Sequence, residues 1–94
     1  MGETFMTALK GRRPTAETIA GIALAAALRA RFGLSRMEAV VACALADGLT
    51  YQQTADRCGV SYHTVHTHVK AIHVKARVSS NARLQALIRK IEAV

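Results

Sequence analysis

The residues best suited to chemistry lie close together between positions 62 and 76. This stretch contains four histidines and two lysines but no aspartate or glutamate. A cationic surface without carboxylates suits a polyanion such as nucleic acid. In a helix, side chains spaced i, i+3, i+4 and i+7 share one face. His63, His66, Thr67 and Lys70 have this spacing, so we expect them to form one polar face.

The residues before this stretch predict that it is the second helix of a pair. Thr50 is a good N-cap and Gln53 completes a capping box, which predicts a short helix over 50–58. Gly59 provides a turn, and Ser61 can cap a longer helix over 62–76. Two helices joined by a short glycine-containing turn are typical of helix-turn-helix proteins, whose second helix enters the DNA major groove.

The same region resembles the DNA-binding domain of LuxR/GerE-type transcriptional regulators. The resemblance covers residues 33–94 and is sharpest at two motifs, Thr64-Val65-x-Thr67-His68-Val69-Lys70 and Val78-Ser79-Ser80. It implies an all-α fold: a four-helix helix-turn-helix domain over 33–94, here preceded by an extra alanine-rich helix. It also implies sequence-specific binding of double-stranded DNA in transcription regulation.

The resemblance assigns base or groove-wall contacts to the positions of His63, His66, Thr67 and Lys70. Imidazole can donate to or accept from base edges, and a threonine methyl can meet the thymine methyl. Lys70 can reach guanine or a phosphate.

A second set of residues is expected to contact the DNA backbone, because hydroxyls and helix N-termini favour phosphates. For Thr50 the alternative is a capping role alone, and for His68 a packing role. The expected backbone contacts are Thr50, Tyr51, Thr64, His68 and Lys75.

The last helix, predicted from Ser79 or Ser80 to about Glu92, resembles the dimerisation helix of the family. Its apolar residues recur at i, i+3, i+4 and i+7, which makes them either a homodimer contact or ordinary core. They are Leu84, Leu87, Ile88 and Ile91.

The residues before position 33 predict a tail over 1–14 and a helix over 15–32 that serves in packing or dimerisation. Gly33 would end this helix. Its expected inner stripe is Ile19, Ile22, Ala23, Ala26 and Ala30, widened by Leu24 and Leu28. Ser35 and Glu38 form a capping box for the next helix, which runs to about Ala46 and faces inward through Met37, Val40, Val41, Ala44 and Leu45.

Several positions depart from the family pattern. Thr54 replaces an isoleucine and Cys58 a leucine. His73, Ala76 and Arg77 replace the more usual leucine, leucine and glycine, and His66 replaces a common lysine or arginine. We therefore expect looser packing around the helix-turn-helix turn and an unusual turn at Arg77. Cys43 is expected to lie off the core face of its helix.

Composition excludes several other classes of function. The chain has 94 residues and a net charge of +7, which fits one basic domain. With two cysteines that we expect to be reduced, we expect it in the cytoplasm, associated with the nucleoid. Its longest apolar run, 19–28, is too short for a membrane span, so no membrane partner is expected.

Neither a metal, a cofactor nor an enzyme activity is expected. His63 and His66 could share a metal, but zinc requires four ligands and the chain has no Cys-x-x-Cys pair. No phosphate-binding loop, nucleophile elbow or paired carboxylates occur. The prediction is a DNA-binding regulator that acts as a homodimer. The alternative is an interaction module that pairs with a larger LuxR-type regulator.

Overall fold

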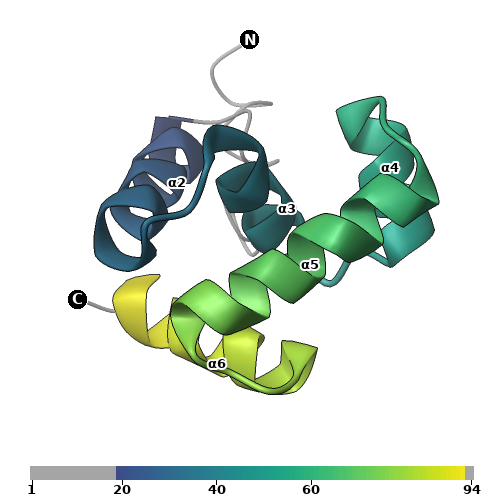
Figure 1. The fold of residues 1–94 in the computed structure, drawn as a ribbon. Coiled ribbons are helices and arrows are strands. Elements are labelled where there is room, and N and C mark those ends of the chain that lie inside the picture. The colour runs from purple at the N-terminus through teal and green to yellow at the C-terminus, as the bar shows by residue number, and fades with distance from the viewer. Residues whose placement is uncertain (1–18, 93–94) are drawn as a thin grey trace, which may run out of the picture.

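Residues 19–92 are described by a computed structural model, and they are all-helical, as predicted (Figure 1). The predicted tail over 1–14 and the start of the helix over 15–32 lie outside this part. The helices are α2 (Ile19–Phe32), α3 (Arg36–Ala46), α4 (Tyr51–Cys58), α5 (Tyr62–Ala76) and α6 (Asn81–Glu92).

Helix α3 lies at the centre and contacts each of the other four helices (Figure 1). Eight of its 11 residues are buried, because a helix with neighbours on all sides keeps almost no solvent face. Val41, Ala44 and Leu45 face inward as predicted, whereas Met37 and Val40 are only half-buried. The prediction for Cys43 was wrong, since it belongs to the core.

Helix α2 packs mainly on α3 and buries a narrow face made of Gly21, Leu24 and Leu28. The predicted alanine-rich stripe was wrong: Ile22 is 59% exposed, and Ala23 and other alanines of that stripe also face solvent. Leu24 and Leu28 are buried instead, because a leucine side chain removes more apolar area from water than an alanine side chain does.

Local capping decides where α3, α4 and α5 begin, as predicted. The Ser35 hydroxyl accepts the Glu38 N–H (3.1 Å), and the Glu38 carboxylate accepts the Ser35 N–H (2.9 Å). Thr50 and Gln53 exchange the same pair of hydrogen bonds at the start of α4. Gly59 ends α4 in the left-handed conformation (φ 69°), and Ser61 then caps α5.

The turn between α4 and α5 is well packed, contrary to the looser packing expected. Thr54 is fully buried, and its hydroxyl donates to the Thr50 carbonyl oxygen (2.8 Å). This bond satisfies the polar group that replaces an isoleucine methyl. Cys58 is half-buried against the same core.

Helix α6 covers α3 with two of the four residues in its predicted apolar stripe. Leu84 and Ile88 are 2% and 0% exposed, so for these two the core alternative holds. Leu87 and Ile91 are half-buried at the edge of the core. The Gln85 side chain donates to the Leu45 carbonyl oxygen (2.7 Å), which also ties α6 to α3.

Candidate nucleic-acid interface

Helix α5 has a buried face and an opposite outward face. Val65, Val69 and Ile72 form the buried face and are at most 3% exposed, as predicted. The residues turned away from the core are exposed, and we call them the outward face of α5. They are His63, Thr67, Lys70 and Val74.

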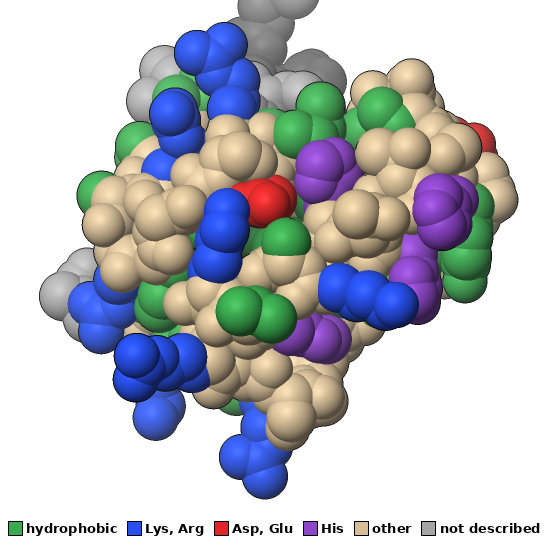
Figure 2. Space-filling view, in the orientation of Figure 1, with side chains coloured by type: hydrophobic (Ala, Val, Ile, Leu, Met, Phe, Trp, Pro, Cys, Tyr) green, Lys and Arg blue, Asp and Glu red, His purple; other side chains and the backbone are tan. Residues whose placement is uncertain are grey.

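The outward face suits a groove lined with hydrogen-bonding groups. Thr67 donates its hydroxyl proton to the His63 carbonyl oxygen (3.1 Å), which leaves its methyl group and oxygen lone pairs outward. Figure 2 shows histidine, lysine and arginine side chains gathered on the side of the molecule that α5 crosses, with few acidic side chains among them. This surface can therefore approach a polyanion without like-charge repulsion.

Val74 belongs to this face and was missed in the sequence. It is 77% exposed, an unusual position for a valine. It follows Lys70 by four residues and Thr67 by seven, so the spacing rule that selected the other residues would have found it. An exposed apolar group here can contact a thymine methyl.

His66 lies on one flank of α5 rather than fully on the outward face. It is half-buried, and its ring meets the Tyr51 ring edge-on with centroids 6.0 Å apart. Tyr51 also contacts Tyr62, whose ring centroid is 5.9 Å away. The structure thus joins His66, predicted to contact bases, with Tyr51, predicted to contact phosphate.

Tyr51 is also hydrogen-bonded to the start of α6. The Asn81 side-chain amide nitrogen donates to the Tyr51 hydroxyl oxygen (2.9 Å). The side-chain oxygen of Asn81, Oδ1, lies 2.8 Å from Nε2 of His73. Neither Asn81 nor His73 was selected from the sequence as a site residue, because their separation from Tyr51 along the chain hides the contact.

The other flank of α5 carries Thr64, His68 and Lys75, three of the predicted backbone contacts. Thr64 and His68 are half-buried, and the Thr64 hydroxyl lies 2.9 Å from that of Ser61. Lys75 instead forms an ion pair with Glu38 at the start of α3 (2.7 Å). The ammonium group of Lys75 therefore already has a partner within the protein.

The Lys75–Glu38 pair sets the charge state of Glu38. Burial of the carboxylate acts to raise the pKa of Glu38, but the hydrogen bonds from Lys75 and Ser35 and the charge of Lys75 hold it below its ordinary value. Glu38 thus both caps α3 and anchors the C-terminal half of α5.

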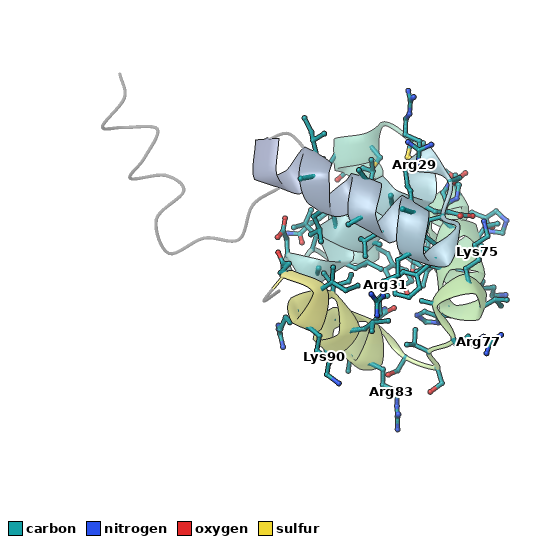
Figure 3. All side chains as sticks on the ribbon, turned by 90° about the vertical axis from the view of Figure 1, so that its left-hand side faces the viewer. Arg29, Arg31, Lys75, Arg77, Arg83 and Lys90 are labelled. Carbon is teal, nitrogen blue, oxygen red and sulfur yellow. The ribbon has the colours of Figure 1, made fainter. Side chains whose placement is uncertain are left out.

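Positive charge extends beyond α5 onto neighbouring helices. Figure 3 shows Arg29 and Arg31 on α2, Arg83 and Lys90 on α6, and Arg77 after α5. An open groove of about 570 Å³ lies between the end of α5 and α6. It is lined by Arg77, Val78, Ser79, Arg83, Ala86, Leu87 and Lys90.

Two further findings concern metals and membranes. Within residues 19–92, no group of three or more histidine, cysteine, aspartate or glutamate side chains is arranged to hold a metal ion. No helix in that range has the length and apolar character needed to cross a bilayer.

Comparison with known proteins identifies a family for most of the described helices. A family model described as bacterial regulatory proteins, luxR family (GerE), matches residues 33–88, which are 56 of the 94 residues. No curated protein and no solved structure gives a significant match to the chain.

Proposed function

The chain belongs to the LuxR family of bacterial regulatory proteins and carries its DNA-binding domain, and we propose that it regulates transcription by reading a specific DNA sequence with α5. The observation that carries this proposal is the outward face of α5. It presents His63, Thr67 and Lys70 to solvent on a helix whose opposite face is buried. The protein would act on the nucleoid in the cytoplasm, where bacterial DNA lies.

Insertion of α5 into the major groove is supported by size and chemistry. A helix with its side chains is about 10–12 Å across, which matches a groove about 12 Å wide. Lys70 can donate to guanine, His63 can hydrogen-bond to purine edges, and the methyl groups of Thr67 and Val74 can meet thymine. His66, on the flank, can reach the groove wall.

Phosphate contacts are proposed for the residues beside this face. Thr50 and Tyr51 begin α4, where backbone N–H groups and the helix dipole favour an anion. Thr64 and His68 lie on the other flank of α5. For Lys75 the support is weaker, because a phosphate must compete with Glu38 for its ammonium group.

We propose further that the protein binds DNA as a homodimer through the exposed edge of α6. Leu87 and Ile91 remain half-accessible there, whereas Leu84 and Ile88 are already used inside the molecule. A two-fold dimer would place two recognition helices in successive major grooves about 34–36 Å apart, which requires a palindromic site.

A second function is favoured by one observation. Helix α2 precedes the family match and exposes an apolar surface that includes Ile22 and Ala26. Such a surface suits an interaction module that pairs with a larger LuxR-type regulator and alters its DNA binding.

Selection of bound sequences from a random DNA pool tests the proposed function. A sequence-reading protein should enrich one motif, and dimer binding should enrich a palindrome. Thr67→Ala and Lys70→Ala should each weaken binding to that motif by about 1–3 kcal/mol, with a smaller loss on random DNA. Arg29→Ala is the charge-matched control, because it removes one positive charge from α2, a helix that is not proposed to enter the groove.

Salt dependence separates the two functions. A sequence reader should keep a preference for its motif over random DNA at every salt concentration, although both affinities fall as salt rises. An interaction module should show only weak binding that is blind to sequence. Equal losses for Lys70→Ala on both DNAs would place Lys70 on phosphate alone.

A further inference from the structure

We propose that Asn81, at the start of α6, positions the Tyr51 hydroxyl so that it donates a hydrogen bond to a DNA phosphate, and that His73 orients Asn81. The inference rests on the proposed function, in which Tyr51 is a backbone contact. It makes Asn81 and His73 positioning residues, which act through Tyr51 rather than on DNA directly.

The contact joins three helices at one point. Tyr51 belongs to α4, His73 to α5 and Asn81 to α6. Asn81 Nδ2 lies 2.9 Å from the Tyr51 hydroxyl, and Asn81 Oδ1 lies 2.8 Å from His73 Nε2. All three side chains are half-buried, so these hydrogen bonds are partly shielded from competing water.

The direction of the hydrogen bonds follows from their donors. Because the Asn81 amide nitrogen donates to Tyr51, its carbonyl oxygen must face His73. That oxygen can only accept, so His73 Nε2 carries a hydrogen and donates it. The order of donation is therefore from His73 to Asn81 and from Asn81 to Tyr51.

This order leaves the proton of the Tyr51 hydroxyl available. A phenol both accepts and donates, and here its accepting site is taken by Asn81. No residue in the described part of the chain accepts the hydroxyl proton in a hydrogen bond. The Tyr51 ring also contacts the rings of Tyr62 and His66, so its hydroxyl has a defined place beside the flank of α5 that carries His66.

A phosphate bond from Tyr51 would set how α5 sits in the groove. Phosphate contacts determine the register and orientation of a protein on the duplex. Tyr51 touches His66 directly, so the same bond would place His66 against the groove wall. Asn81 and His73 would thereby affect DNA recognition without touching DNA.

A double-mutant cycle between positions 51 and 81 tests the inference. Affinity for the selected DNA motif is measured for wild type, Tyr51→Phe, Asn81→Ala and the double variant, at constant salt and pH. Each single change should weaken binding about 3- to 10-fold, as expected for loss of one hydrogen bond. The double variant should bind no more weakly than Tyr51→Phe, because Asn81 acts only through the hydroxyl.

Two further variants separate positioning from simple stability. His73→Gln replaces the imidazole N–H donor with an amide N–H donor and should bind within about 2-fold of wild type. His73→Leu removes the donor and should match Asn81→Ala. Tyr62→Phe is the matched control, because it removes a neighbouring hydroxyl that is not bonded to Asn81. Thermal melting of each variant confirms that it is folded at the assay temperature.

Each outcome decides one point. Additive losses in the double variant would show that Asn81 acts separately from Tyr51, which overturns the inference. Lower melting temperature with unchanged affinity in Asn81→Ala would leave Asn81 a structural residue and also overturns it. If wild type reads its motif but Tyr51→Phe binds equally well, only the inference fails. If wild type binds no DNA motif, the proposed function fails as well.

Discussion

At the scale of single residues, the four histidines of α5 differ in their surroundings. His63 is exposed on the outward face, while the other three are half-buried. His66 packs against Tyr51, and His73 is hydrogen-bonded to Asn81. Their contributions to DNA binding should therefore differ, with His63 the freest to respond to a phosphate or a base.

Binding to DNA should tighten as pH falls from 8 to 6. A nearby phosphate favours the protonated form of an imidazole, the side chain whose charge most readily changes in this pH range. Binding then takes up a proton, so lower pH favours the complex. Dissociation constants at pH 8, 7 and 6, at constant ionic strength, measure the effect. His63→Asn should flatten the profile, and a profile already flat in wild type would remove His63, His66 and His68 from phosphate contact.

Glu38 should stabilise the fold above its ordinary pKa and lose this effect in acid. Its pKa is lower in the folded state, so the contribution is present above about 4.5 and disappears as pH falls below that value. Glu38→Gln keeps the capping acceptor but removes the charge. It should cost about 0.5–1 kcal/mol at pH 7, since Lys75 is partly exposed, and less at pH 3. Urea unfolding at both pH values checks this, and an equal cost at both would assign it to packing.

At the scale of elements, the end of α5 is strained. Arg77 adopts the left-handed conformation (φ 57°, ψ 46°) and is the only residue other than glycine in the described part with positive φ. This conformation costs an L-residue about 1–2 kcal/mol. The Val78 N–H still reaches the His73 carbonyl oxygen (3.0 Å), so the helix ends in a regular hydrogen-bonded turn despite the strain.

Arg77→Gly should therefore raise stability, by about 0.5–1 kcal/mol, because glycine adopts this conformation without a steric penalty. The melting temperature should rise by about 2–8 °C for a domain of this size. Gly59→Ala provides the opposite case, since Gly59 has φ 69° and a Cβ there would meet open space. It should lower stability through backbone strain alone. A drop in stability for Arg77→Gly would mean that the Arg77 side chain makes contacts that outweigh the strain.

At the scale of the whole molecule, α6 has two different edges. Leu84 and Ile88 hold it to α3, while Leu87 lies beside the groove lined by Arg83 and Lys90. In a two-fold dimer through Leu87, these cations would approach those of the second copy. We therefore expect self-association to strengthen with salt, which screens like charges, whereas DNA binding weakens.

Leu87→Asp and Leu84→Asp should behave differently. Leu87→Asp should give a folded monomer that binds a palindrome much more weakly but a half-site almost normally. Leu84→Asp places an unpaired charge in the core and should unfold the domain, as truncation of a buried leucine alone costs about 2–5 kcal/mol. Sedimentation and circular dichroism distinguish the two. A wild-type protein that stays monomeric at high salt and on DNA would end the dimer proposal.

The sequence alone determined where α3, α4 and α5 begin, because these ends depend on neighbours three or four residues apart. The Ser35–Glu38 and Thr50–Gln53 boxes and the left-handed Gly59 are of this kind. It also placed His63, Thr67 and Lys70 on the outward face of α5, since helical spacing fixes which side chains share a side. The family motifs between positions 64 and 80 indicated the DNA-binding class.

Only the tertiary structure decided which side chains stay exposed once the helices pack. Which side of α2 is buried, and whether Leu84 belongs to the core, depend on where α3 lies. Lys75 meets Glu38 across 37 positions, and Asn81 meets Tyr51 across 30. Such contacts follow from the relative placement of whole helices, which no local spacing rule encodes.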